Sequence, residues 1–214
     1  MIRIHIIRSE AVEMELYDGV ATLLNQFAGP MKFHTDEDYA RFLDNEIQEK
    51  YIAAAEFYDM LYPHNKNNEG VQNYVPRVWE ETTWSSIFNK CREYRKKKHL
   101  SGEDMVILLT DLRNDKNWFS ASDPLGENNF FIQTSQWEYF LHAEPRFPVS
   151  FLIATAVLHH CMFPDYTSLT QNMHHDLRGC ISDFCQDKRE ISLKMRTADI
   201  CDDCISILKN QSVS

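Results

Sequence analysis

Glycine is scarce in this chain, which has only six among its 214 residues. Neither a P-loop nor a G-x-G-x-x-G is present, so the usual loops for cradling phosphates and dinucleotides are missing. The G-x-S-x-G of serine hydrolases and the H-E-x-x-H of zinc peptidases are absent as well. The chain has no internal repeat and no low-complexity segment. These absences exclude a repeat protein and a largely disordered one, and they leave no intact catalytic motif.

Positive charge is also in short supply. Lysine and arginine number 22 against 32 acidic residues, which gives a formal net charge of −10. A protein that binds duplex DNA needs a positive face to displace counterions. The one basic run, Arg92 and 95–98, follows an apolar helical pattern, so it falls in the last turns of a helix, where cations complement the helix dipole. We therefore expect no nucleic-acid partner.

No apolar run is long enough to cross a membrane. The most apolar window, 147–163, contains Pro148, Ser150 and two histidines, and it falls short of the ~20 residues that a spanning helix requires. The first eight residues alternate and carry charge, which is typical of a strand and not of a signal peptide. We therefore expect a cytoplasmic protein with no membrane partner. In a reducing compartment, cysteines indicate metal ligation or burial before disulfides.

Hydrophobic periodicity predicts a chain of mixed strands and helices. Strands are expected over 1–8, 31–35, 105–110 and 129–134, and helices over 12–27, 84–99, 136–141 and 147–162. The run 105–110 is apolar up to its last residue, which favours a central strand covered on both faces. We predict an α/β or α+β fold, a small mixed sheet covered by helices over 1–163, with a C-terminal subdomain over 164–214 packed on it.

The connections between these elements are predicted from capping and turn residues. Asp36 is placed to cap a helix that runs through Ile47, and a second helix is expected over 52–62. The stretch 63–76, rich in Asn, is typical of an exposed loop, and the polar residues 111–129 indicate another.

The metal-ligating residue types gather near the C-terminus. Five of the six cysteines and four of the nine histidines fall between His159 and Cys204. The strongest element is the C-x-x-C at Cys201 and Cys204, because two thiolates with this spacing can bind one tetrahedral ion. The candidates for the remaining two ligands are Cys161, His174, His175, Cys180 and Cys185.

Two ligand sets are feasible from spacing alone. One joins Cys180 and Cys185 to the C-x-x-C, and the other joins His175 and Cys180 to it. Either set gives the closed four-ligand shell of a structural zinc, with no open position for water. Two other interpretations stay open: a thiol redox sensor that uses Cys185 with the C-x-x-C, and unconnected buried thiols. Cys91, alone in a helical pattern, is expected to be a packing residue.

The C-terminal pattern resembles that of the archaemetzincins, compact zinc peptidases of the metzincin group. Their motif runs H-E-x-x-H-x-x-G-x-x-H-C, then four residues, C-x-M, and a closing C-x-x-C. The three histidines hold the catalytic zinc, the glutamate is the general base, and the four cysteines hold a structural zinc. Here His175 stands at the first of those cysteines, with four residues between it and Cys180. The resemblance therefore implies zinc held by His175, Cys180, Cys201 and Cys204, with Cys185 as the alternate ligand.

The resemblance extends over about residues 103–208. The stretch 106–111 with the following 117–119 is similar to the family's strand and its asparagine–phenylalanine loop. The strand 130–134 resembles the edge strand over the family's active-site cleft, and the helix 151–160 resembles the one that carries the zinc motif.

The catalytic part of the motif is missing. If His159 is the first histidine, His160 stands in place of the glutamate and Phe163 in place of the second histidine. Only His159 and His174 can be matched to catalytic ligands, and the base is absent. The resemblance therefore implies that the catalytic zinc and the peptidase activity are lost while the structural zinc is kept.

The function that we predict is binding of a protein or peptide partner, with the edge strand 130–134 accepting an extended segment. The alternative is a zinc-dependent metallopeptidase or other hydrolase with a non-standard histidine site. That site would be built from His159, His160 and His174, with His175 as an optional fourth histidine and Glu138 or Glu144 as a borrowed base. One zinc per chain is expected for the first function and two for the second.

Overall fold

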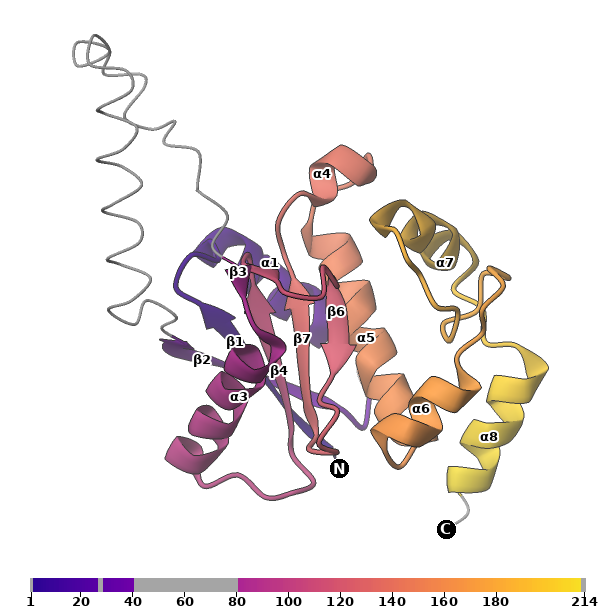
Figure 1. Ribbon diagram of the computed structural model, residues 1–214, viewed down its shortest axis with the longest axis horizontal. Coiled ribbons are helices and arrows are strands. Elements are labelled where there is room, and N and C mark those ends of the chain that lie inside the picture. Colours follow the sequence, from indigo (N-terminus) through magenta and orange to yellow (C-terminus); the bar gives the residue numbers. More distant parts are fainter. Residues whose placement is uncertain (1, 27–28, 41–80, 213–214) are drawn as a thin grey trace, which may run out of the picture.

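The computed structural model describes residues 2–26, 29–40 and 81–212 and shows a mixed α/β fold (Figure 1). Its centre is a five-stranded sheet in the order β2 (Lys32–Ala40), β1 (Arg3–Ser9), β4 (Met105–Thr110), β7 (Asn129–Gln133), β6 (Ser120–Ser122). The first four strands are parallel, and β6 is antiparallel to β7. The predicted fold class, a small mixed sheet covered by helices, is confirmed.

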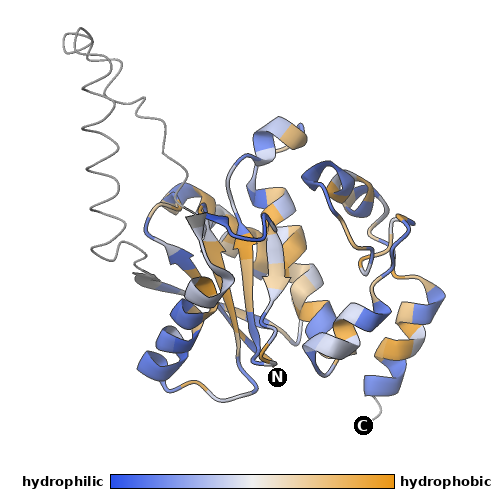
Figure 2. Ribbon diagram, viewed as in Figure 1, coloured by the Kyte–Doolittle hydropathy of each residue, from blue (hydrophilic) through white to orange (hydrophobic). Residues whose placement is uncertain are grey.

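The middle strand β4 separates two apolar clusters. All six of its residues are buried. Met105 and the alternate residues after it pack with α1 (Met14–Asn25) and α5 (Arg146–Met162), whereas Val106 and Leu108 pack with α3 (Trp84–Lys98). Because side chains alternate along a strand, an uninterrupted apolar run is what a strand with helices on both sides requires. Figure 2 shows hydrophobic residues concentrated on the central strands and on α5, and hydrophilic residues along much of α3.

The four helices predicted within the described residues are confirmed. They are α1, α3, α4 (Trp137–Phe140) and α5. The side chain of Thr83 caps α3 by accepting a hydrogen bond from the Ser86 N–H, and α3 ends at His99, which has a left-handed φ of 51°. Arg95 and the three lysines that follow it lie in its last turn, as predicted, and Arg92 lies before that turn. Cys91 is buried in the α3 cluster, so the prediction of a packing role is confirmed.

The prediction that Asp36 caps a helix is wrong. Asp36 lies within β2, which pairs with β1 as far as Ser9 and Ala40. The hydroxyl of Tyr17 accepts the Asp36 N–H at 3.0 Å, so a contact from α1 holds the backbone in place. Strand pairing therefore outweighs the local capping signal. The rest of that predicted helix, the helix over 52–62 and the loop over 63–76 lie outside the described residues.

The prediction of an edge strand over 130–134 is also wrong. The stretch 111–129 is not a simple loop: it contains β5 (Arg113–Asn114), which pairs with β3 (Glu81–Thr82), and β6, which pairs with β7. The strand β7 therefore has neighbours on both sides, and β6 takes the edge. The sequence of β6, Ser-Ala-Ser, has none of the β-branched or aromatic residues that mark a strand.

The C-terminal part of the chain packs against the end of α5. It comprises α6 (Tyr166–Asn172), the 3-10 helix η2 (Lys188–Glu190), α7 (Ile191–Thr197) and α8 (Asp202–Ser212). Two isolated bridges, His174 with Asp183 and Cys180 with Asp199, hold the irregular segment between α6 and η2. No described helix alone has the length and apolar character to cross a membrane; α5 and α6 reach that level only as a pair, bent by 106°.

Candidate metal centre

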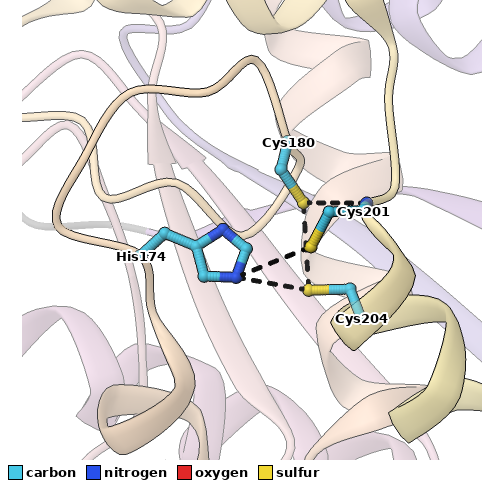
Figure 3. A group of neighbouring side chains, drawn as sticks. All are labelled: His174, Cys180, Cys201 and Cys204. Carbon is cyan, nitrogen blue, oxygen red and sulfur yellow. Dashed lines mark hydrogen bonds between the residues drawn. The ribbon is translucent and has the colours of Figure 1, made fainter.

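Four side chains from the C-terminal part of the chain converge on one point (Figure 3). His174 follows α6, Cys180 lies in the irregular segment, Cys201 stands just before α8, and Cys204 lies in the first turn of α8. The donor atoms of all four lie within 4.8 Å of one another. The structure thus brings together three of the four ligands in the favoured set and adds a different histidine.

The distances between donor atoms suit a tetrahedral ion. The Sγ atoms of Cys180 and Cys204 are 3.8 Å apart, and His174 Nε2 lies 3.8 Å from Cys201 Sγ and 3.7 Å from Cys204 Sγ. Zinc–sulfur bonds of about 2.3 Å place two thiolates of a tetrahedron about 3.8 Å apart. The donor set of three sulfurs and one imidazole nitrogen is also the set that zinc accepts in structural sites. Both the chemistry and the spacing of these residues therefore fit a zinc-sized ion.

The N-terminal end of α8 places partial positive charge beside Cys201 and Cys204. The N-terminus of a helix carries a partial positive charge that stabilises a nearby thiolate. The Cys201 N–H also donates to Cys180 Sγ over 3.4 Å, so a backbone donor faces a third sulfur. These donors and the helix dipole compensate part of the negative charge that three thiolates would gather.

Asp183 fixes the orientation of the histidine. Its Oδ1 lies 3.1 Å from His174 Nδ1, and its Oδ2 accepts the backbone N–H groups of Arg178, Gly179 and Cys180 at 2.7, 2.7 and 3.1 Å. Because a carboxylate can only accept, this contact places a proton on Nδ1, so in a metal-ligating ring Nε2 is the nitrogen that binds the ion. The lone pair is then on Nε2, which faces the cysteines. Carboxylates in this position orient metal-ligating histidines and raise their basicity.

Burial and nearby charge set the acidity of the thiols. Burial raises the pKa of Cys204 to about 12. Burial also opposes the ionisation of Cys201, but hydrogen bonds, the largest from the Cys204 backbone, outweigh it and lower the pKa of Cys201. Lys194, which is only 3% exposed, donates from Nζ to the Asp183 carbonyl at 3.0 Å. Its charge offsets some of the negative charge of the centre.

The assignment of His175 as the zinc-ligating histidine needs correction. The cluster contains His174, whereas His175 lines a neighbouring cleft. The cause is backbone pairing: the His174 N–H donates to the Ser182 carbonyl at 2.9 Å, and the Phe184 N–H donates to the His174 carbonyl at 2.8 Å. In such an extended segment successive side chains point to opposite sides, so only one of two adjacent histidines can face the cysteines.

The alternate ligand Cys185 also lies outside the cluster. Its Sγ donates weakly to the Asp183 carbonyl at 3.8 Å, and it lines the same cleft as His175. Burial raises its pKa to about 11, which makes it a poor thiolate. A redox set of Cys185 with Cys201 and Cys204 is therefore not assembled in this structure.

The two catalytic candidates, His159 and His174, occupy different sites. His159 is 8% exposed on α5 and lines the cleft, with its Nε2 3.3 Å from Ser182 Oγ, whereas His174 belongs to the cysteine cluster. Burial lowers the pKa of His159 to about 3, so its ring is neutral at neutral pH. His160, about 100° further round the helix, borders a smaller neighbouring cavity.

The cleft itself has a volume of about 610 Å³. The strand β6 and the residues before it line one side, α5 lines another, and the part of the chain from α6 through α7 lines a third. Its lining is largely apolar and aromatic, and includes Trp118, Phe119, Phe130, Leu152, Tyr166 and Phe184. A concave, mostly apolar pocket of this size with a few polar groups is typical of a binding site.

A second metal site is not assembled within the described residues. No further group of three or more His, Cys, Asp or Glu side chains converges there as the four ligands do. Glu138 and Glu144, the candidates for a borrowed base, do not line the cleft. The sequence analysis also missed Ser182 and Asp183, which carry no recognisable motif and gain their roles only from contacts across the fold.

Comparison of the chain with protein-family models, curated proteins and solved structures gives no match. The function is therefore inferred from the four-residue cluster and the cleft.

Proposed function

We propose that this protein is a zinc-stabilised binding protein whose cleft takes an extended segment of a protein or peptide partner. The observation that carries the proposal is the closed set of four donors beside an open, apolar cleft. Three sulfurs and one nitrogen complete a tetrahedral shell, so a zinc ion there has no free position for water and serves stability. Chemistry on a substrate would need a different centre.

The cleft is bordered by a strand edge that can pair with a peptide. Phe119 O accepts from Gln133 N at 2.7 Å, and Asp123 N donates to Asn129 O at 2.9 Å. In an antiparallel pair, residues that are hydrogen-bonded to the partner strand alternate with residues that are not. The backbone N–H and C=O groups of Ser120 and Ser122 therefore face away from β7. Within the described residues, β6 has no strand on that side. An unpaired edge beside an apolar pocket is the arrangement that strand addition uses.

We also propose that the chain is a degenerate, archaemetzincin-like protein. The support is the position of His159, on the helix that resembles the family's zinc-motif helix and beside the cleft. His160 stands where the family has its catalytic glutamate. A histidine that is kept beside the cleft without the neighbouring glutamate favours a protein that has lost the catalytic zinc and retained the structural one.

Metal content tests the zinc part of the proposal and separates it from the hydrolase alternative. Protein purified without added metal should hold one zinc per chain. Cys204→Ser should lose it, and Cys161→Ser, which alters a cysteine outside the cluster, should keep it. Two zincs per chain, one of them lost in His159→Ala with the fold intact, would favour a metallopeptidase or other hydrolase with a non-standard histidine site.

Peptide selection tests the cleft. Peptides from a random phage-displayed library should be enriched on the wild-type chain and should bind Ser122→Ala with similar affinity. Ser122→Pro removes one outward N–H, a change that edge strands tolerate, and it should weaken the selected peptides at least about tenfold. Equal binding to all three proteins would rule out pairing along β6.

A further inference from the structure

The cleft and the smaller cavity beside it meet along the edge strand β6. The residues that line both of them are Ser122, Phe130, His159, Tyr166 and Leu169. The cleft also takes in the residues before β6 from Lys116 onward, whereas the smaller cavity takes in residues after it as far as Asn128. The two hollows therefore follow β6 from one end to the other, and together they are called the β6 groove.

The charged residues of the cleft lining leave one cation open to solvent. Of the lysine, arginine, aspartate and glutamate residues described, only Lys116, Asp183 and Lys194 line the cleft. Asp183 and Lys194 are 1% and 3% exposed, and both have hydrogen-bond partners within the fold. Lys116 is exposed, and no carboxylate in the described part of the chain pairs with it. Its ammonium group is therefore available to a ligand.

The ring of Trp84 holds Lys116 at this end of the groove. The Lys116 Nζ lies 4.0 Å from the centre of that ring, whose face attracts a cation. Trp84 is 4% exposed and fixed in turn, because its Nε1 donates to Asn114 Oδ1 at 3.0 Å. The neighbouring acid Asp115 accepts the Trp84 backbone N–H at 3.0 Å and does not line the groove. A positioned positive charge thus stands where the groove begins.

The other end of the groove is acidic. The smaller cavity is lined by Asp123, Glu127 and Asp165, and by no described lysine or arginine. Arg92 lies 2.6 Å from Asp123 Oδ2 and 3.0 Å from Glu127 Oε2, so one guanidinium serves two carboxylates. Asp165 is exposed, and its Oδ1 accepts the Ser168 N–H at 2.7 Å as the cap of α6. No cation among the described residues pairs with Asp165.

We infer that the β6 groove selects an extended segment that carries an acidic side chain where it passes Lys116 and a basic side chain where it passes Asp165. The apolar and aromatic lining between them takes apolar side chains. Complementary charges at the two ends give specificity and fix the register of a bound segment. Because the chain has a net charge of −10, it repels acidic peptides in general, so an acidic preference needs a local cation. The inference rests on the proposed function and adds the chemistry of the partner to it.

Selection from a random phage-displayed peptide library on the full chain tests this charge pattern. Peptides enriched on wild type should carry an acidic residue toward one end and a basic residue toward the other. Lys116→Met should lose only the acidic preference. Asp165→Asn, which keeps a capping oxygen for α6, should lose only the basic one. The controls Lys32→Met and Asp18→Asn alter exposed residues that line neither cavity, and they should select the wild-type pattern.

A charge reversal distinguishes a lost contact from a lost fold. Lys116→Glu should replace the acidic preference at that end with a basic one, which is a gain that an unfolded variant cannot produce. Calorimetry then compares a selected peptide with a counterpart in which glutamine replaces the acidic residue. Wild type should bind the acidic peptide about two- to fivefold more tightly, and Lys116→Met should bind both equally. Added salt should reduce the preference of wild type, because exposed charges are screened.

The outcomes separate this inference from the proposed function. Enriched peptides without a charge pattern, or with a pattern that either Lys116→Met or Asp165→Asn leaves intact, would overturn the inference and leave peptide binding in place. A pattern that Lys32→Met or Asp18→Asn also abolishes would show an effect of net charge and would overturn it as well. A library from which wild type enriches no peptide would overturn both the inference and the proposed function.

Discussion

The Nδ1 atom of His174 lies 3.1 Å from Oδ1 of Asp183, and this contact turns the Nε2 edge of the imidazole toward three cysteines. The same carboxylate accepts three backbone N–H groups from the segment that ends at Cys180. One buried side chain therefore positions two of the four ligands. Its loss should affect metal binding more than the removal of any exposed acid.

We predict that Asp183→Asn weakens zinc binding about 10–100-fold. The amide cannot accept from all of the donors that surround the carboxylate, and its NH₂ group faces N–H groups. Competition with a chromophoric chelator measures the change. Asp176→Asn, in the same segment but exposed, is the control and should bind like wild type. Equal affinities in the two variants would contradict the role given to Asp183.

Alanine substitutions of the two adjacent histidines should have very different effects on zinc content. His174→Ala removes a donor and should reduce zinc content well below one per chain. His175→Ala alters only a residue of the cleft lining and should keep one zinc. Atomic absorption measures the zinc content of both purified variants. Loss of zinc in His175→Ala but not in His174→Ala would restore the ligand set that the sequence resemblance implies.

Gly179 should be intolerant of any side chain. Its φ is +87°, and a Cβ there would lie 2.7 Å from two atoms of the Thr197 side chain. Gly126 also has a positive φ, of +79°, but has open space around it. We expect Gly126→Ala to cost about 1 kcal/mol of unfolding free energy and Gly179→Ala about 1–3 kcal/mol more. Urea unfolding of both variants compares them, and equal losses would show that Thr197 moves aside.

Lys188 should make stability depend on pH. Burial lowers its pKa to about 8, while its Nζ donates to the Ser135 carbonyl at 2.6 Å and lies 4.6 Å from the Trp137 ring. The unfolded chain, with a lysine pKa near 10.5, binds the proton more tightly than the fold does. Unfolding free energy should therefore rise with pH from about 8 to about 10.5, by up to about 3 kcal/mol.

The matched variant for this prediction is Lys188→Met, which keeps an unbranched side chain one atom shorter and removes the charge. The difference in unfolding free energy between the two proteins, measured across that pH range, isolates the lysine from all other titrating groups. A difference that stays constant with pH would show that the pKa of Lys188 is not lowered in the fold.

Features carried by local pattern could be predicted from the sequence. The apolar run of β4 indicated a strand with helices on both faces, and the spacing of Cys201 and Cys204 indicated two ligands at one ion. Both depend on residues close together in the chain.

Features decided by long-range pairing could not be predicted. Asp36 has the chemistry of a helix cap but lies in a strand because β1 lies beside it. The edge position of β6 depends on β7 as its partner and has no strand signal of its own. The choice of His174 over His175 depends on backbone hydrogen bonds to residues eight to ten positions away.

The ligands are also the ends of a long chain segment, since His174 and Cys204 are 30 positions apart. Between them lie most of the residues that form the third side of the cleft, from His175 through Cys185 to Lys194. A metal ion held by these ligands is therefore a cross-link that closes a loop, and it removes conformational entropy from the unfolded segment as a disulfide does. The cleft therefore keeps its shape only while the loop is closed. A chelator that removes the metal should open the loop and disrupt the cleft without unfolding the sheet.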